Sequence, residues 1–244
     1  MKLKNTFLVP YTLLIWIYII LIFVLHILYT VTCRPFAKDP ELFSIRATDP
    51  LFYIGFKLFG ITLVINGQEN IPKDTNFILV ANHQSILDIP ILMYGIRTKI
   101  VFIAKEELLK VPLLGWQIKA LGHFTINRSN AKSSVTQLRS IEKRLENHEK
   151  SVILFPEGTR STTGKIAEFK KGAFMMAVNS GTTLLPCHLE GTGKIANKKQ
   201  LLIHPGTITL TIHPPIPVTK IENLVQAKAK AEELRLEIQQ IIEH

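Results

Sequence analysis

A histidine and an aspartate lie five residues apart in the segment NHQSILD (residues 82–88), directly after an apolar run. A neutral imidazole is the commonest general base near pH 7, and a carboxylate can hold it in the required tautomer. On one straight helix, five residues at about 100° each would place the two side chains roughly 140° apart. They can meet if His83 lies on the turn that leaves a strand and Asp88 lies in the next helix, with Ser85 as N-cap of a capping box. The simpler interpretation, in which Asp88 only caps its helix and His83 is an ordinary turn residue, stays open on these residues alone.

A second polar segment, FPEGTRS (residues 155–161), also follows an apolar run. Ligands of open α/β sheets gather outside the C-terminal ends of the strands. Glu157 and Arg160 supply a carboxylate and a planar cation there, and Gly158 lets the backbone approach a ligand. An ordinary strand-ending turn with a local ion pair is the alternative interpretation.

Further basic residues follow other expected strands. Lys105 comes after one apolar run, and Arg128 ends the segment FTINR (residues 124–128). Lys170 or Lys171 precedes an expected helix. Single basic residues are usually solvated surface charges, but at neighbouring strand ends several of them, with Arg160, could meet one phosphate group.

Seven strands are needed to place these segments, and they are expected to alternate with helices. Such alternation predicts an α/β domain with a largely parallel, mixed sheet flanked by helices. One helix is indicated by apolar residues at three- and four-residue spacing, Val135, Leu138, Ile141 and Leu145, ending near His148. A C-terminal helix is indicated by Ile221, Leu224, Ala231, Leu234, Ile238 and Ile241. The expected strands are 61–65, 76–81, 99–103, 123–126, 151–155, 182–188 and 207–213.

The N-terminal region is strongly apolar, with no formally charged residue from position 7 to position 31. About 20 apolar residues suffice to cross a bilayer core, so a spanning helix is the first interpretation. The alternative is a hairpin in one leaflet, formed with the apolar residues 51–64, which look interfacial. Basic residues flank the run on both sides, so they do not orient it. We expect a membrane-anchoring segment over residues 1–38 and one catalytic domain over residues 39–244.

Composition restricts the classes of protein further. The 244 residues include 29 Lys+Arg and 19 Asp+Glu, a formal net charge of +10, with a mean hydropathy of +0.22. Intrinsic disorder is excluded because it requires low hydrophobicity. The only cysteines, Cys33 and Cys187, are far apart, so neither a disulfide framework nor a zinc cluster is expected. The positive charge is scattered without a recognisable reader motif, which argues against nucleic-acid binding.

The order of these motifs resembles that of the glycerolipid acyltransferase family, in particular the 1-acylglycerol-3-phosphate (lysophosphatidic acid) acyltransferases. NHQSILD, FTINR, FPEGTRS and the later Leu185-Pro186 match that family's four motif blocks in sequence and approximate separation. The likeness covers roughly residues 61–213, and Cys187 stands where many members have a small aliphatic residue. The combined blocks are specific for the superfamily and much less specific for the acceptor.

The resemblance implies direct acyl transfer from a thioester, without an acyl-enzyme. His83 would be the general base and Asp88 would hold its tautomer. No G-x-S-x-G nucleophile elbow is present. The reaction requires no metal or cofactor beyond the thioester co-substrate.

The resemblance also assigns the substrate-binding residues. Arg128 and Arg160, with Lys105, would hold the acceptor phosphate. Glu157 and Gly158 would position the glycerol hydroxyl, with Thr159 in the same binding segment. Pro186 would help to shape the acyl-chain or thioester site.

The expected function is therefore a membrane-bound enzyme that acylates the sn-2 hydroxyl of lysophosphatidic acid to give phosphatidic acid in phospholipid biosynthesis. The donor would be acyl-CoA or acyl carrier protein, and the expected location is the inner (cytoplasmic) membrane with the catalytic domain facing the cytoplasm. Another lysophospholipid, an ornithine-type lipid or glycerol 3-phosphate is the alternative acceptor. A non-enzymatic binder of anionic lipid is the more distant alternative.

Overall fold

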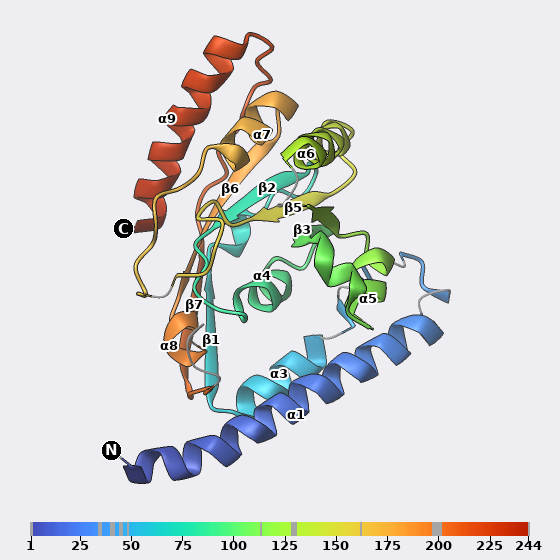
Figure 1. Ribbon diagram of the computed structural model, residues 1–244, viewed down its shortest axis with the longest axis vertical. Helices are drawn as coiled ribbons and strands as arrows, with labels where there is room; N and C mark the ends of the chain where they lie inside the picture. Colours follow the sequence, from blue (N-terminus) through green and yellow to red (C-terminus); the bar gives the residue numbers. More distant parts are fainter. Residues whose placement is uncertain are drawn as a thin grey trace.

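A seven-stranded sheet forms the centre of the protein in the computed structural model (Figure 1). Its strand order is β1-β7-β6-β2-β5-β3-β4, and every neighbouring pair is parallel except the antiparallel pair β6–β7. The predicted largely parallel sheet is thereby confirmed. The strands are β1 Ile61–Asn66, β2 Phe77–Ala81, β3 Ile100–Lys105, β4 Phe124–Ile126, β5 Ser151–Leu154, β6 Thr183–Glu190 and β7 Gly206–Ile212. The structure describes residues 2–33, 36–39, 42–43, 46–47, 49–112, 114–127, 131–161, 163–196 and 202–243.

Helices cover both faces of this sheet. In Figure 1, α7 and α9 lie on one side of it, and α4 lies on the other side, toward α1 and α3. Two hydrophobic clusters reflect this division, because alternate residues of β2 belong to different clusters: Ile78 and Val80 to one, Phe77 and Leu79 to the other. The α-helices are α1 Lys2–Cys33, α3 Asp49–Leu58, α4 Asp88–Ile96, α5 Leu114–Ala120, α6 Ala131–Glu146, α7 Gly172–Ser180, α8 Thr192–Ile195 and α9 Leu224–Glu243; η2 Gln68–Asn70 and η3 Glu106–Lys110 are 3-10 helices.

Strand β2 is the strand that directly precedes residues 82–88. All five of its residues are buried, because it has parallel neighbours on both sides and helices on both faces. Its position in the middle of the sheet explains its continuous apolar sequence FILVA. The pairing and burial of β2 therefore fix the position at which the chain leaves the sheet after Ala81.

The C-terminal helix differs in detail from the predicted one. Ile221 precedes α9, and Leu224 is 60% exposed, whereas Ala227 and Ile242 are buried. The Asn223 side-chain oxygen accepts hydrogen bonds from the backbone N–H groups of two residues in the first turn, at 3.0 and 3.1 Å. This N-cap fixes where the helix starts and so which residues face the sheet.

The apolar stretch 51–64 does not form one element. Its first part lies in α3 and its second part in β1, joined by a turn in which Gly60 has a φ of +54°. Positive φ values are readily adopted by glycine because it has no Cβ. The second half cannot take the predicted interfacial role, since β1 is paired with β7 in the sheet. Only the first half, in α3, could take it.

Helix α1 lies beside α3 along the outside of the domain (Figure 1). The Tyr18 hydroxyl donates to the carbonyl oxygen of Leu51 at 2.8 Å, and the Tyr11 hydroxyl donates to that of Phe59 at 2.7 Å. The segment Leu8–Tyr29 is long and apolar enough to cross a membrane, by length and composition. One side of this helix is thus packed on the protein.

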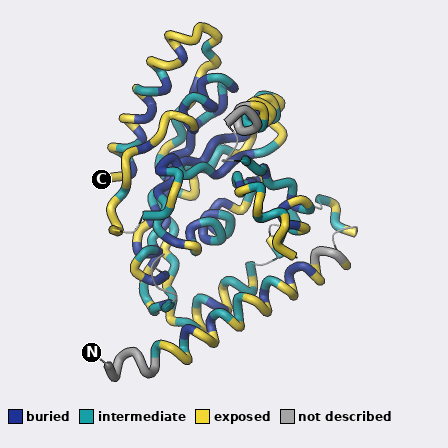
Figure 2. The backbone as a smooth tube through the Cα atoms, viewed as in Figure 1, coloured by how far each residue is buried: buried dark blue, intermediate teal, exposed yellow. Residues whose placement is uncertain are grey.

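The other side of α1 is apolar and exposed. Figure 2 shows exposed residues recurring along the helix. Isolated exposed apolar residues are ordinary, but a continuous apolar face marks an interaction surface. The outer face contains Leu13, Leu14, Ile17, Ile20, Leu21, Val24, Leu25 and Leu28, which are between 37% and 62% exposed.

Candidate active site

The two polar segments meet because their strands are neighbours. Strand β2 pairs in parallel with β5 on one side and with β6 on the other. The C-terminal ends of parallel neighbours lie at the same edge of a sheet. Residues 82–88, which follow β2, are therefore brought against residues 155–161, which follow β5.

His83 and Asp88 form a hydrogen-bonded pair at this edge. The His83 Nδ1 and Asp88 Oδ2 atoms are 2.7 Å apart, and the His83 side chain is 17% exposed while that of Asp88 is completely buried. An ionised carboxylate only accepts hydrogen bonds, so the proton lies on Nδ1 and the neutral imidazole keeps its lone pair on Nε2. The predicted meeting of His83 with Asp88 is therefore confirmed, and the role of His83 as a general base stays a prediction.

The Asp88 carboxylate is fixed by the backbone as well. Its Oδ2 atom also accepts hydrogen bonds from the N–H groups of Gln84 and Ser85, at 2.7 and 2.8 Å. Asp88 is the first residue of α4, where the helix dipole favours a negative charge. The predicted helix start is displaced, because Leu87 rather than Ser85 occupies the N-cap position. Asp88 nevertheless binds the Ser85 N–H group as the capping-box pattern requires.

Two other residues of the turn fasten it to β6 and to the end of α8. The Asn82 side chain donates to the Leu189 carbonyl oxygen and accepts from the Leu189 N–H group, both at 2.8 Å. The Ser85 hydroxyl donates to the Ala196 carbonyl oxygen at 2.8 Å. Sequence reasoning gave Asn82 no role. A polar residue directly after a fully buried strand was the available signal, because such a side chain needs a partner.

Phe155 is a further residue that the sequence did not single out. Its ring stacks on the His83 imidazole with centroids 4.0 Å apart and an angle of 17° between the planes. The ring therefore restricts the rotation of His83 from one side while Asp88 holds Nδ1. Its place at the head of FPEGTRS, next to Pro156, was the only sequence indication of this contact.

Glu157 points away from solvent and toward the backbone. Its Oε1 atom accepts a hydrogen bond from the His83 N–H group at 2.6 Å, and its Oε2 atom accepts one from the Ala167 N–H group at 3.0 Å. The residue is only 3% exposed. Burial raises the pKa of Glu157, while these two hydrogen bonds oppose the rise. This arrangement differs from the predicted contact with the glycerol hydroxyl, because both oxygens are engaged by the protein.

The basic residues predicted to bind phosphate differ in burial and in position. Arg160 is half-buried in the turn after β5, and Lys105 is exposed at the end of β3, the other neighbour of β5. Thr159 beside Arg160 is exposed. Arg128 lies outside the described residues.

Gly158 and the two lysines of the same loop are also resolved by the structure. Gly158 has a φ of +74°, and the Lys170 ammonium lies 2.9 Å from where a Cβ atom on Gly158 would be. Glycine at this position therefore allows Lys170 to approach the turn. Lys171 is directed elsewhere, because its ammonium is 3.1 Å from a carboxylate oxygen of Glu232 on α9.

The fourth motif lies within the sheet. Pro186 is in β6, next to Val80 of β2, and both residues are buried. Cys187 is completely buried, and burial raises the pKa of its thiol. Cys187 is thus a core residue. The role of Pro186 in shaping an acyl or thioester site stays a prediction.

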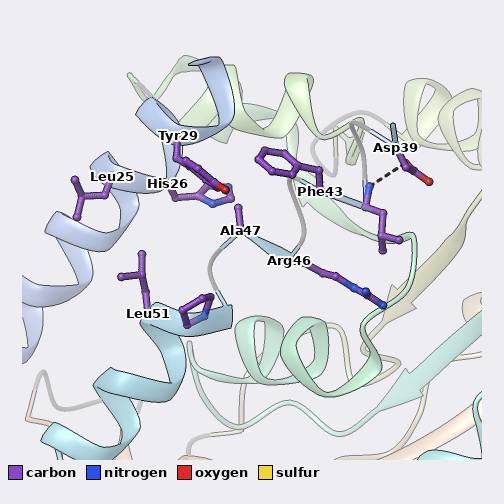
Figure 3. A pocket seen from close by; sticks show the side chains of 10 residues that line it. Leu25, His26, Tyr29, Asp39, Phe43, Arg46, Ala47 and Leu51 are labelled. Carbon is purple, nitrogen blue, oxygen red and sulfur yellow. Dashed lines mark hydrogen bonds between the residues drawn. The ribbon is translucent and has the colours of Figure 1, made fainter. Parts of the chain in front are cut away.

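A cavity of about 720 Å³ lies away from this site (Figure 3). It is an open hollow between the C-terminal half of α1, the segment that leads to α3 and the start of α3, and no residue of segments 82–88 or 155–161 lines it. Its walls come from Leu25, His26, Tyr29, Asp39, Leu42, Phe43, Arg46, Ala47, Pro50 and Leu51.

Comparison with curated proteins gives relatives over the same region. A chloroplastic 1-acyl-sn-glycerol-3-phosphate acyltransferase, LPAT1, of Arabidopsis thaliana is 38% identical over 173 residues, covering 69% of this chain and 48% of the relative. The 1-acyl-sn-glycerol-3-phosphate acyltransferase of Borreliella burgdorferi is 32% identical over 169 residues, covering 69% of this chain and 67% of the relative. The matched region spans about half the length of the chloroplastic relative.

A solved structure and a family model cover the fold. The crystal structure of the 1-acyl-sn-glycerophosphate (LPA) acyltransferase PlsC from Thermotoga maritima is 31% identical, with a TM-score of 0.83, and the match covers 98% of this chain and 95% of that one. The family model described as Acyltransferase matches residues 62–190, which include β2, β5, β6 and both polar segments. On these similarities and on the His83–Asp88 geometry, the chain belongs to the acyltransferase family.

Proposed function

We propose that this protein transfers an acyl group from a thioester, acyl-CoA or acyl carrier protein, to the sn-2 hydroxyl of 1-acylglycerol 3-phosphate, giving phosphatidic acid. The observation that carries the proposal is the His83–Asp88 pair, with a partly exposed imidazole and a buried carboxylate 2.7 Å apart. The names of the relatives support lysophosphatidate as the acceptor.

The reaction follows from the tautomer of His83. The acceptor hydroxyl attacks the thioester carbonyl carbon while Nε2 of His83 removes its proton. The tetrahedral intermediate then collapses with cleavage of the carbon–sulfur bond, and the imidazolium returns the proton to the departing thiolate. Asp88 stabilises the imidazolium and does not need to accept the proton itself.

Two protein nucleophiles close to the His83 turn, Ser85 after β2 and Cys187 in the neighbouring β6, are buried, which is consistent with direct attack by the acceptor. The Ser85 hydroxyl is buried and donates to the Ala196 carbonyl oxygen. Cys187 is buried in β6. A covalent acyl-enzyme on either of these two side chains would need that side chain to be exposed and activated.

We further propose that Arg160 and Lys105, together with Arg128, bind the acceptor phosphate. Guanidinium groups suit phosphate because they can donate two parallel hydrogen bonds. Arg160→Ala should raise the KM for lysophosphatidate more than the KM for a lysolipid without the phosphate. An equal effect on both acceptors would exclude the phosphate contact.

The outer face of α1 supports attachment to a membrane, with α1 and α3 lying together in one leaflet. The side-by-side packing of α1 on α3 favours this arrangement over an isolated spanning helix. Because acyl-CoA and acyl carrier protein are cytoplasmic, we place the catalytic domain at the cytoplasmic face of the inner membrane.

A product assay tests the chemistry. Full-length protein in mixed micelles is given lysophosphatidate, another lysophospholipid, an ornithine lysolipid or glycerol 3-phosphate, each with acyl-CoA and with acyl carrier protein, and the products are identified by mass spectrometry. His83→Ala should abolish turnover above background, whereas His204→Ala, on the segment before β7, should keep it. Full activity of His83→Ala would exclude the assignment of the base.

A further inference from the structure

The Glu157 carboxylate joins the two segments of the active site through the backbone of the catalytic histidine. We propose that Glu157 is a positioning residue, which sets the place of His83 through its backbone amide and does not bind the acceptor. The proposal rests on the proposed function, in which His83 is the general base. It assigns to Glu157 a different role from the contact with the glycerol hydroxyl that the sequence suggested.

Both oxygens of Glu157 are committed to N–H donors from different segments. Oε1 accepts from His83, which follows β2, and Oε2 accepts from Ala167, which precedes α7. With the residue 3% exposed, a substrate hydroxyl would have to displace one of these donors. An unpaired N–H group buried at the base of the catalytic turn would be costly.

The backbone carbonyl of His83 is held as well, by the loop that follows β5. The Ser161 N–H group donates to the His83 carbonyl oxygen at 2.8 Å. The backbone N–H of His83 is bound by Glu157 and its backbone carbonyl by Ser161, so the loop after β5 restrains both ends of the residue. Phe155, at the start of that loop, stacks on the imidazole ring.

This restraint matters for catalysis because the base must be placed accurately. A displacement of about 1 Å at a reacting group can lower a rate by roughly 10²-fold. Asp88 fixes only Nδ1 of the ring, whereas Glu157 fixes the point from which the side chain starts. The two carboxylates therefore hold His83 at opposite ends.

The substitution Glu157→Gln separates the two roles. Glutamine can still exchange hydrogen bonds with a substrate hydroxyl, but it has only one acceptor oxygen, so it cannot accept from both the His83 and the Ala167 N–H groups. We expect kcat to fall by roughly 10- to 100-fold, with the KM for lysophosphatidate changed by less than about twofold because no acceptor contact is lost. Hydrogen–deuterium exchange of residues 82–88 should become faster in the full-length protein.

Glu168→Gln is the matched control. It makes the same change on the same loop, but the Glu168 side chain is 83% exposed and forms only a long surface ion pair with Arg235, at 3.4 Å. Its kinetics and the exchange of residues 82–88 should equal those of the unmodified protein. Thermal unfolding of each variant, measured in the same micelles, identifies any general loss of folding.

Two outcomes would overturn the proposal. One is a Glu157→Gln variant with unchanged kcat and a raised KM for the acceptor, which would indicate a substrate contact. The other is unchanged exchange of residues 82–88. The exchange experiment needs no substrate, so it tests the positioning role even if the unmodified protein shows no acyl transfer, a result that would contradict only the proposed function.

Discussion

The turn of residues 82–88 and helix α1 differ in opposite ways from the general rule that polar side chains are exposed and apolar ones buried. Asn82, Ser85 and Asp88 are polar and completely buried, whereas Leu14 and Ile20 of α1 are apolar and 60% and 62% exposed. Buried polar groups and large exposed apolar patches are the informative departures from the general rule. The turn offsets its burial with hydrogen bonds to β6, to the loop after β5 and to the end of α8. The outer face of α1 is instead turned away from the domain, as the proposed attachment to a membrane requires.

The largest effect is expected at the buried carboxylate of the turn. In Asp88→Asn the amide oxygen can still accept from the backbone, but the charge that stabilises the imidazolium and selects the tautomer is lost. We expect kcat to fall by about 10³-fold or more with folding retained, as measured by steady-state kinetics and circular dichroism. Asp74→Asn, at an exposed position, is the control. A decrease of less than tenfold in Asp88→Asn would show that His83 does not depend on this pair.

The second effect concerns the exposed apolar face of α1. Replacing Leu14 and Ile20 with Lys should release the protein from phospholipid vesicles, because the binding of an interfacial helix scales with the apolar area that it buries in the membrane. Flotation of full-length protein with vesicles measures this. Val225 and Leu236 of α9 are also exposed apolar residues, at 77% and 50%, and replacing them with Lys should leave flotation unchanged. Equal losses in both pairs would contradict a specific role for α1.

A third prediction concerns Asn82, whose role is to fasten the turn. Asn82→Ala leaves the N–H and C=O groups of Leu189 without their side-chain partner in a buried position. We expect the free energy of unfolding to fall by about 2–6 kcal/mol, since two buried groups lose their partner and each costs roughly 1–3 kcal/mol. Denaturant titration measures the change. Gln84→Ala, which removes one exposed bond to the Gly164 carbonyl oxygen, should cost less than about 0.5 kcal/mol.

The last prediction concerns His123, a residue with no proposed chemical role, and its effect appears only when the pH is lowered. Its Nδ1 accepts a hydrogen bond from the Phe102 N–H group at 3.4 Å, and burial, with the nearby charge of Lys150, lowers the pKa of His123 from 6.5 to about 3. The unfolded chain therefore binds a proton below about pH 6.5 that the folded protein does not, so stability is complete above that pH and decreases as the pH falls toward 3.

The variant His123→Gln removes this titration. Between pH 6.5 and pH 4 its stability should decrease less steeply than that of the unmodified protein, by at most about 1.4 kcal/mol per pH unit. Denaturant unfolding at several pH values, compared between the two proteins, isolates the contribution of this residue. Parallel pH dependences would show that His123 titrates normally in the folded state.

Several features were predictable because they depend on local patterns. All seven strands were predicted within two residues at each end, because short β-branched runs between turns are a local signal. The meeting of residues 82–88 and 155–161 was also predictable, because both follow strands of a parallel sheet. The face of α9 was predicted less well, because the cap at Asn223 and the neighbouring sheet decide which residues are buried.

The sequence by itself predicted that His83 and Asp88 can meet, the α/β class and the apolar N-terminal helix. These follow from residue types and short-range periodicity. Only the tertiary structure decided the partners of Glu157, the clamp between Asn82 and Leu189, and the stacking of Phe155 on His83. Asn82 and Leu189 are separated by 107 positions, and nothing in the composition of either segment specifies which donor meets which acceptor. That choice is made by the order of strands in the sheet, which brings their ends together.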